Sequence, residues 1–333
     1  MNLMQQQRID LMVRLGEYLV SEDLGLQRVK ELACHRNGWF IPPFVDFALE
    51  NIASSYLDRG KLTSWLADYQ PEQEPGRTVG IVMAGNIPAV GFHDLMCGFL
   101  SGHSLRVKLS SKDDVLMRHF IDKLISWESA LGEEIRIEDM LRGCDAYIAT
   151  GSNNTARYFH QYFAKYPHII RRNRTSVAVL DGKEDAGELS RLSDDILLYF
   201  GLGCRNITKI YVPEGYDFLP LLEALKRYNY LMEDHHYKNN FDYNLSIALL
   251  NREIYMTNQL VILLERKEIF SRIGVLHYEI YRNPSDLKDA LDRQEDIQCI
   301  VGHGWLPFGK AQSPALGDFA DGVDTMRFLK EIK

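Results

Sequence analysis

Hydrophobic residues near the start of the chain recur at helical spacing. One set precedes Pro42-Pro43 and a second set follows it, where proline suits the first turn of a helix. These positions are Ile9, Met12, Val13, Tyr18 and Leu19, then Phe44, Phe47, Ala48 and Ile52. We therefore predict a helical region over residues 1–68. The polar stretch 69–77 contains two prolines and a glycine and predicts a loop.

From residue 78 onward, short apolar runs alternate with helical patterns. Residues 78–84 are apolar and rich in β-branched side chains, which is typical of a buried parallel strand. Further strands are predicted at 105–109, 146–150 and 176–180, with helices at 89–101, 115–127 and 153–163. A second alternating set predicts strands at 209–212, 259–264, 275–281 and 297–301, and helices at 185–199, 218–231 and 244–256. This alternation indicates an α/β protein with two parallel-sheet lobes and a helical N-terminal region.

Net charge, hydropathy and cysteine content exclude several classes of protein and of binding partner. The 333 residues carry a net charge of −8, which argues against nucleic acid or an anionic membrane as the main partner. No apolar run approaches the ~20 residues of a membrane span, and the first residues lack the pattern of a secretory signal. The five cysteines are scattered and show no zinc-ligand spacing, so neither a metal site nor a disulfide framework is expected. We expect a cytoplasmic protein without integral membrane contact.

The loops that directly follow predicted strands are the first places to search for a ligand site, because parallel sheets bind ligands at the carboxyl ends of their strands. Three such loops are Gly85-Asn86-Ile87-Pro88, residues 108–113 and Gly151-Ser152-Asn153. The last begins a predicted helix, whose N-terminus suits a phosphate, although a capping serine alone explains the pattern equally well. Neither a GxGxxG nor a GxxxxGK[ST] motif is present in the required setting.

A second candidate lies in residues 201–206, between a predicted helix and a predicted strand. Glycines shortly before Cys204 leave its sulfur uncovered, and the positive charge of Arg205 favours the nucleophilic thiolate. A small buried cysteine in a loop is the alternative. The other cysteines, Cys34, Cys97, Cys144 and Cys299, lie in apolar or helical patterns and are expected to be core thiols. Residues 233–236 (Glu-Asp-His-His) are expected to form a polar surface turn rather than a metal site.

Taken in order, these segments resemble the aldehyde dehydrogenase superfamily, and more closely its LuxC-like acyl-CoA (fatty acyl) reductases. Six segments between residues 37 and 329 carry the resemblance: 37–53, 76–114, 144–159, 200–213, 267–291 and 303–329. They contain an Asn-x-Pro turn, a strand ending in lysine, a Gly-Ser turn, the loop around Cys204, a Glu-Ile-Phe stretch and a Pro-Phe-Gly stretch. The resemblance implies a two-lobed fold in which the lobes bind cofactor and substrate at a cleft.

The same resemblance implies a role for each matching residue. Cys204 matches the catalytic nucleophile, and Asn86 matches the asparagine whose amide holds the oxyanion. The cofactor residues that it implies are Lys108, Ser111, Gly151, Ser152, Glu268 and Phe270. Glu268 and Phe270 match positions near the nicotinamide ribose and ring. His303, in the C-terminal stretch, receives no role.

Two departures from the family pattern refine the expected reaction. Residues 179–183 (Val-Leu-Asp-Gly-Lys) are matched to the stretch in which aldehyde-oxidising members carry a water-activating glutamate, which places Val179 at that position. Without this base, water competes poorly for the acyl-enzyme, which suits reduction of a thioester. After Lys108, the sequence has Ser111 and Lys112 instead of an acidic partner for the 2′-OH of NAD, which favours NADPH over NADH.

The expected activity is therefore reduction of an acyl thioester (acyl-CoA or acyl-carrier protein) to an aldehyde, through an S-acyl intermediate on Cys204 with CoA as leaving group. Alternatives are an acyl-phosphate reductase, a cofactor-free cysteine acyltransferase and a non-catalytic nucleotide-binding protein. The implied domains are a helical region at 1–68, a nucleotide-cofactor lobe at 69–178, a catalytic lobe at 179–310 and a C-terminal segment at 311–333. A homo-oligomer or an acyl-activating partner enzyme is also expected.

Overall fold

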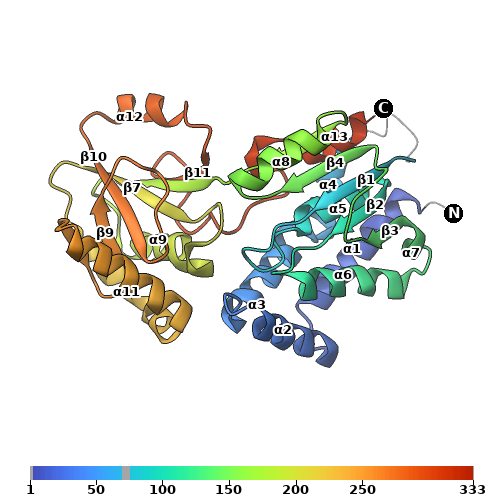
Figure 1. Cartoon of the computed structure of the whole chain (residues 1–333), viewed down its shortest axis with the longest axis horizontal. Coiled ribbons are helices and arrows are strands. Elements are labelled where there is room, and N and C mark those ends of the chain that lie inside the picture. The colour runs from blue at the N-terminus through green and yellow to red at the C-terminus, as the bar shows by residue number, and fades with distance from the viewer. Residues whose placement is uncertain (1–2, 70–75, 333) are drawn as a thin grey trace. The chain divides into compact units, whose positions relative to one another are not determined.

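The computed structural model describes residues 3–69 and 76–332 (Figure 1). Most of the loop predicted at 69–77 lies outside these residues. The chain divides into two compact units, Met1–Asn173 with Pro314–Lys333 and Arg174–Ser313. Within the described ranges, no helix combines the length and hydropathy that crossing a bilayer requires.

The first unit begins with helices, as predicted. They are α1 (Gln5–Leu19), α2 (Leu24–Arg36), α3 (Pro42–Asn51), a π-helical turn (Ile52–Tyr56) and α4 (Arg59–Ala67). The prolines at 42 and 43 occupy the first turn of α3. Asp23 and Asp58 cap α2 and α4 by accepting hydrogen bonds from the backbone N–H groups of Leu26 and Lys61.

Five parallel strands form sheet A of this unit, in the order β3-β2-β1-β4-β5. Their bounds are β1 (Thr78–Val82), β2 (Ser104–Lys108), β3 (Ile135–Ile137), β4 (Ala146–Thr150) and β5 (His168–Arg171). The helices of this part are α5 (Phe92–Ser101), α6 (Asp114–Trp127), α7 (Leu131–Glu134), α8 (Asn153–Phe163) and α13 (Thr325–Glu331). The central strands are buried, which is why β1, β2 and β4 were recognisable as apolar runs. Strands β3 and β5 are short and were not predicted.

The second unit contains sheet B, with the strand order β11-β6-β7-β10-β9-β8. The strands are β6 (Thr175–Val179), β7 (Ile207–Pro213), β8 (Tyr255–Thr257), β9 (Ile262–Glu265), β10 (Val275–Tyr281) and β11 (Ile297–Gly302). The helices are α9 (Ala186–Leu197), α10 (Leu219–Leu225), α11 (His235–Leu250) and α12 (Pro284–Leu291), with 3₁₀ turns at Leu198–Gly201 and Lys226–Glu233. Sheet B is mixed rather than wholly parallel, because a short hairpin joins β8 to β9 and such a connection pairs strands antiparallel.

Several predicted boundaries were wrong for identifiable reasons. The helix predicted from residue 89 begins at Phe92, because Ala89 has a left-handed backbone with φ of 54°. The helix predicted at 244–256 is α11, which begins nine residues earlier at His235 and ends before β8. Its N-cap is Asp234, whose carboxylate accepts from the backbone N–H groups of residues 236 and 237, so the stretch 233–236 starts a helix.

The C-terminal residues return to the first unit and complete its core. Met326 and Leu329 are fully buried there. Arg171, which ends β5 and is itself buried, donates hydrogen bonds to Thr325 Oγ1 at 2.7 Å and to Ala320 O at 2.6 Å. Residues 314–333 are therefore an integral part of the unit that contains sheet A.

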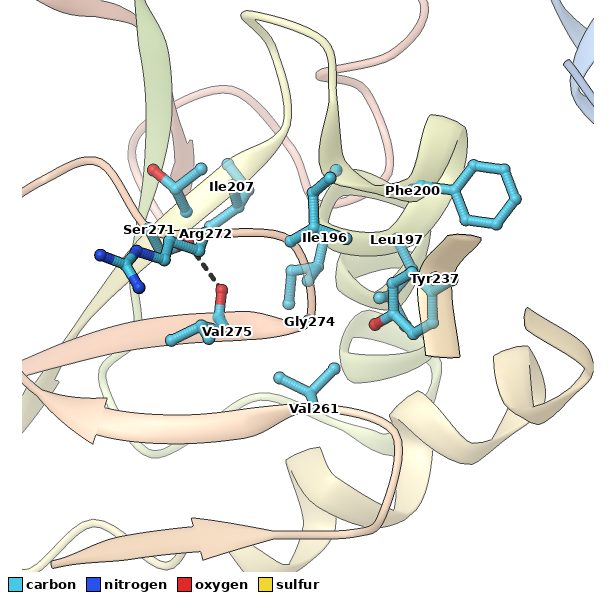
Figure 2. Close-up of a pocket in the computed structure, with 13 residues that line it drawn as sticks. Ile196, Leu197, Phe200, Ile207, Tyr237, Val261, Ser271, Arg272, Gly274 and Val275 are labelled. Atoms are coloured by element: carbon cyan, nitrogen blue, oxygen red, sulfur yellow. Dashed lines mark hydrogen bonds between the residues drawn. The ribbon is translucent and has the colours of Figure 1, made fainter. Parts of the chain in front are cut away.

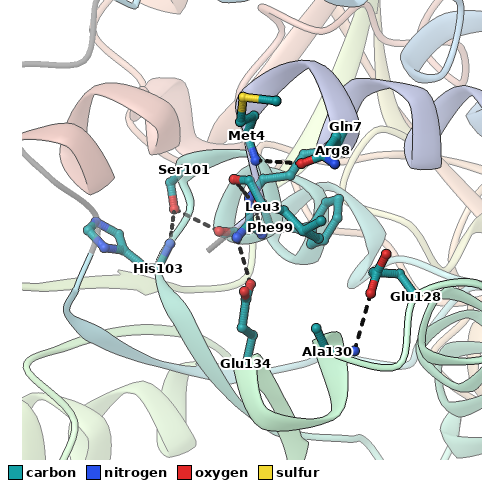
Figure 3. Close-up of polar contacts among 11 residues, drawn as sticks. Leu3, Met4, Gln7, Arg8, Phe99, Ser101, His103, Glu128, Ala130 and Glu134 are labelled. Carbon is teal, nitrogen blue, oxygen red and sulfur yellow. Dashed lines mark hydrogen bonds and ion pairs between the residues drawn. The ribbon is translucent and has the colours of Figure 1, made fainter. Parts of the chain in front are cut away.

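A buried arginine joins helix α1 to the rest of the first unit (Figure 3). The Arg8 side chain is 2% exposed and forms a 2.6 Å ion pair with Glu134 of α7. Its guanidinium also donates to the backbone carbonyl of Phe99 at 3.1 Å and lies over the Phe99 ring. Because a buried charge is stable only when paired, the ion pair with Glu134 helps to hold α1 in place.

We expect Glu134→Ala to lower the free energy of unfolding by about 3 kcal/mol, because it removes the carboxylate that forms a 2.6 Å ion pair with the buried Arg8. The matched control is Glu133→Ala, which removes the exposed 2.7 Å ion pair with Arg136 and is expected to cost less than about 1 kcal/mol. Urea unfolding of both variants measures the difference. Equal losses would show that Arg8 does not depend on Glu134.

Candidate functional site

The structure brings the predicted first-unit residues to one edge of sheet A. Asn86 follows β1, Lys108 ends β2, and Gly151-Ser152 follow β4. These three strands are neighbours and run parallel, so their carboxyl ends lie at the same edge. The side chains of Lys108, Ser111 and Ser152 are exposed there. This edge is therefore open to a polar ligand.

The turn that carries Asn86 packs closely on the loop after β2. Gly85 is buried, and a Cβ at this position would lie only 2.6 Å from Ser110 Oγ and 3.0 Å from Asp113 Cβ. Only glycine fits this close approach. The backbone N–H of Met83 also donates to the carbonyl of Lys108 at 3.0 Å, which continues the pairing of the two strands. Asn86 and Lys108 are thus held on adjoining backbone segments.

Asp113, which the sequence analysis did not single out, anchors the same turn. Its side chain is buried, and Oδ2 accepts from the backbone N–H of Ala89 at 2.7 Å. This bond fixes the left-handed residue that follows the Asn86 turn. Among the described residues, Oδ1 has no hydrogen-bond partner. Burial raises the pKa of Asp113 to about 7.

Ser152 has the capping role that the sequence left open. Its hydroxyl oxygen accepts from the backbone N–H of Thr155 at 3.3 Å and caps helix α8. A Cβ on Gly151 would lie 3.0 Å from Thr155 Cβ, so this turn is also closely packed. The cap leaves the other N–H groups of the first turn available to an anion.

The loop around Cys204 begins with three consecutive left-handed residues in the second unit. Tyr199, Phe200 and Gly201 have φ values of 54°, 56° and 75°. Such conformations are costly for residues with a Cβ and are concentrated at functional sites. The loop then reaches Cys204, which is half-buried, just before β7 begins.

Asn206 holds this loop through both ends of its amide. Its Oδ1 accepts from the backbone N–H of Gly203 at 2.7 Å. Its Nδ2 donates to the carbonyls of residues 195, 196 and 198, at 3.1, 3.3 and 2.8 Å. The Asn206 side chain is fully buried. It therefore links the end of helix α9 to the backbone immediately before Cys204.

Ser176 of β6 supports the loop from the neighbouring strand. Its hydroxyl donates to the carbonyl of Cys204 at 3.1 Å and lies 3.1 Å from the sulfur of Cys299. Cys299 and Cys34 are half-buried, which differs from the core position expected for them, whereas Cys97 and Cys144 are buried as predicted. All five cysteines are thiols without disulfide bonds.

Asp195 connects helix α9 to the Pro-Phe-Gly stretch. Its carboxylate accepts from the backbone N–H groups of Gly309 at 2.6 Å and Ala311 at 3.0 Å. Burial raises its pKa to about 7. The position was missed in the sequence because an acidic residue inside a helical pattern normally indicates a solvated face.

The expectation about Val179 was wrong. Val179 ends β6 and pairs with Tyr211, whereas Cys204 precedes the other end of β7, where Ile207 pairs with Ser176. Val179 lies three strand residues beyond Ser176, which is about 10 Å and farther than a glutamate side chain reaches. The presence of valine at position 179 is therefore no evidence that a water-activating base is missing near Cys204.

Glu268 and Phe270 lie in the segment between β9 and β10, in the same unit as Cys204. Both side chains are exposed.

A pocket borders the Cys204 loop on the side of α9 and β7 (Figure 2). It is small, and its lining combines apolar side chains, among them Ile196, Phe200 and Ile207, with the polar Thr208, Ser271 and Arg272.

His303 belongs to a charged cluster at the carboxyl ends of β6 and β11, whereas Cys204 precedes the amino end of β7. Its ring nitrogens lie 3.1 Å from Asp181 and 3.0 Å from Glu188, and these carboxylates raise the pKa of the imidazole. Asp181, Glu184 and His303 are close enough together to bind a metal ion. The two carboxylates already balance the charge of a protonated His303, so the contacts are explained without a metal.

Comparisons with known proteins agree with this architecture. A model of the family described as acyl-CoA reductase (LuxC) matches residues 33–226. Long-chain acyl-protein thioester reductase 2 of Photobacterium leiognathi is 22% identical over 265 residues, covering 73% of this chain and 53% of that protein. The chain thus spans about half the length of this curated relative.

Solved aldehyde dehydrogenases have the same fold. The P. syringae indole-3-acetaldehyde dehydrogenase, solved with NAD+ and IAA, is similar with a TM-score of 0.64 at 14% identity, covering 90% of this chain and 72% of that chain. A putative aldehyde dehydrogenase from Burkholderia cenocepacia gives 0.65 at 14% identity, with coverages of 93% and 76%. The predicted aldehyde-dehydrogenase-like α/β fold is confirmed.

The buried Asp113 predicts a pH dependence of stability. Because its pKa is raised to about 7 in the folded protein from an ordinary 3.8, folding favours the protonated carboxyl. The stabilisation that the protonated Asp113 adds to the free energy of unfolding is fully present below about pH 4. It is lost as pH rises to about 7, by roughly 1.4 kcal/mol per pH unit. We expect Asp113→Asn to reduce the wild-type slope by this amount, as measured by urea unfolding at several pH values, while Asp195, whose pKa is also raised to about 7, maintains the rest. The matched control, Asp114→Asn, should retain the wild-type slope; a variant at 113 that retains it would contradict the assignment.

Proposed function

The chain belongs to the LuxC acyl-CoA reductase family, and from this premise we propose that it reduces an acyl thioester to an aldehyde with a reduced nicotinamide nucleotide. The observation that carries the proposal is the Cys204 loop. A half-buried thiol follows a left-handed backbone segment, and Asn206 and Ser176 hold its loop from two sides. A fixed, partly exposed thiol is the arrangement that covalent catalysis requires.

The proposed chemistry at Cys204 is acyl transfer. The thiolate attacks the carbonyl carbon of the thioester, and the CoA or carrier-protein thiolate leaves, which gives an S-acyl enzyme. We assign the oxyanion to the side-chain amide of Asn86 and the backbone N–H of Cys204. Cysteine suits this role because a thiolate both attacks and leaves well. A serine ester would accept hydride less readily.

The residues at the edge of sheet A fit a dinucleotide. The buried Gly85 and the closely packed Gly151 keep the backbone free of side chains, and the start of α8 offers N–H groups to a phosphate. We propose that Lys108 and Ser111 contact the adenosine ribose, and that Glu268 and Phe270 contact the nicotinamide half. Bound there, the reduced nucleotide supplies hydride to the acyl carbon. The P. syringae dehydrogenase, which has the same fold, was solved with NAD+, and this supports a nicotinamide cofactor.

We propose NADPH as the preferred nucleotide, with NADH as the alternative. Ser111 and Lys112 are exposed after β2, where an acidic residue would bind the 2′-OH of NAD. A hydroxyl and an ammonium group favour a 2′-phosphate instead. In this proposal, the nucleotide lobe lies in the first unit and the catalytic lobe is the second unit, Arg174–Ser313, which includes β6 and so begins before the expected 179–310.

The acyl donor is proposed to be a thioester of CoA or of a carrier protein. The name of the Photobacterium relative, an acyl-protein thioester reductase, supports a protein-bound acyl group as well as CoA. A protein donor would make an acyl-activating enzyme a partner of this chain. Release of CoA, of a protein thiol or of phosphate in the same assay distinguishes these donors from an acyl phosphate.

We expect Cys204→Ala to abolish both acylation and aldehyde formation, because the nucleophile is lost. Incubation with labelled acyl-CoA, followed by mass spectrometry and by the loss of NADPH absorbance, measures the two steps separately. Cys34→Ala, which removes another half-buried thiol in the first unit, is the control and should retain both. Acylation of the Cys204→Ala protein would overturn the assignment of the nucleophile.

Asn86→Ala is expected to slow acylation by roughly a hundredfold or more, because one oxyanion donor is removed. The rate of CoA release in a single turnover measures this effect without the reduction step. Asn86→Asp serves as a second variant, since it keeps the size of the side chain but offers no N–H donor. Near-normal CoA release by both variants would exclude Asn86 from the oxyanion site.

A further inference from the structure

The backbone that precedes Phe270 is held at three consecutive carbonyl groups. The carbonyl oxygens of residues 267, 268 and 269 accept, in that order, from Lys209 Nζ at 2.7 Å, His277 Nδ1 at 2.9 Å and Thr208 Oγ1 at 2.5 Å. A carbonyl oxygen only accepts, so Nδ1 of His277 carries a proton in this arrangement. Three side chains from two neighbouring strands therefore fix one short loop segment.

A β-bulge allows two consecutive residues to take part. In a regular strand, Thr208 and Lys209 would point to opposite faces of the sheet. The pairing of β7 with β6 shifts here, because Ser176 pairs with Ile207 and Val177 pairs with Lys209. Thr208 is the extra residue. Bulges of this kind redirect side chains and are frequent beside active sites.

The lysine in this set is fully buried. Besides the carbonyl of residue 267, its ammonium group contacts the carboxylate of Glu279 at 2.5 Å and lies 4.7 Å from the centre of the Tyr211 ring. Burying an ammonium group is costly unless it is paired, and a hydrophobic side chain would fill the same space at no such cost. The side chains of Glu268 and Phe270, in contrast, are exposed, and Phe270 retains 42% of its surface. The buried Lys209 and the half-buried Thr208 and His277 thus hold a backbone whose Glu268 and Phe270 side chains are exposed.

We propose that Thr208, Lys209 and His277 are positioning residues that hold Glu268 and Phe270 against the nicotinamide half of the nucleotide. This inference rests on the proposed function, because it assigns the ligand of these two side chains. The three residues do not touch the nucleotide themselves. They fix the loop before the ligand arrives, so binding does not have to order it.

The test uses two variants that remove donors and keep the shape of the side chain, Thr208→Val and Lys209→Met. Thr257→Val is the matched control, since its hydroxyl also donates to a backbone carbonyl, that of Val261 at 2.8 Å, outside this segment. The ligands are NADPH, or NADH if the wild-type enzyme prefers it, and the adenine half alone, adenosine 2′,5′-bisphosphate or ADP. Nucleotide fluorescence or competition measures binding, and stopped-flow absorbance measures hydride transfer.

In both variants we expect binding of the full nucleotide to weaken and hydride transfer to slow, each by roughly tenfold, the equivalent of one lost hydrogen bond. Binding of the adenine half and acylation of Cys204 should stay at wild-type values, as should every step in Thr257→Val. If these residues had a purely structural role, the substitutions would weaken binding of the full nucleotide and of the adenine half equally, or would weaken neither. Either result would overturn the proposal.

Measurements on the wild-type protein distinguish failure of the positioning assignment from failure of the proposed function. If the wild-type protein neither binds a reduced nucleotide nor forms an aldehyde, the proposed function falls and the positioning assignment falls with it. If the wild-type protein does both and the two variants match it, only the positioning assignment is overturned. Lys209→Arg is a second substitution for the case in which Lys209→Met folds poorly, because arginine preserves a donor. We expect Lys209→Arg to bind the full nucleotide more tightly than Lys209→Met does. A folded Lys209→Arg protein that binds no better than Lys209→Met counts against the proposal.

Discussion

The amide of Asn206 is the contact on which the second unit's chemistry depends. It accepts the N–H of Gly203 and donates to carbonyls at the end of α9, so it joins a helix terminus to the residue before Cys204. Without it, the backbone N–H of Gly203 and the carbonyls of residues 195, 196 and 198 would lose this partner. A buried side chain that meets several backbone groups at once makes one loop conformation much more favourable than the others.

A similar arrangement is found at two other segments that carry candidate functional residues. A buried polar group holds the backbone, and the functional side chain lies one or a few residues away. Asp113 does this for the turn of Asn86, and Lys209 does it for the segment of Glu268. Each of these groups is more costly to bury than a hydrocarbon of equal size, so their presence reflects the geometry they impose rather than the stability they add.

Much of the architecture was predictable because buried parallel strands are continuous apolar runs. β4 and β10 have the predicted bounds, and the loops that follow β1, β2 and β4 reach one sheet edge because parallel topology requires it. The three-residue strands β3 and β8 carry too few positions to show a period. The start of α11 was missed because its exposed polar residues mask the helical pattern, although Asp234 was a readable cap signal.

The supporting residues of the site were beyond sequence reasoning for a different reason. Asn206 stands two residues after Cys204 in the same loop, yet nothing in its neighbours shows that its amide spans back to α9. Lys209 lies in an apolar strand, and its target at residue 267 is distant in the sequence. Such contacts depend on the tertiary fold. The misplaced role of Val179 has the same origin, since a short motif does not reveal which end of a strand faces the nucleophile.

The return of residues 314–333 to the first unit has a consequence for synthesis of the protein. Met326 and Leu329 complete a core whose other members lie mostly before residue 174, and Arg171 bonds to Thr325 across this long separation. On the ribosome, the first unit therefore emerges with an open hydrophobic surface and closes only after the whole second unit has been translated. A nascent chain is exposed to aggregation for that interval, and the packing of α13 onto the first unit completes this core.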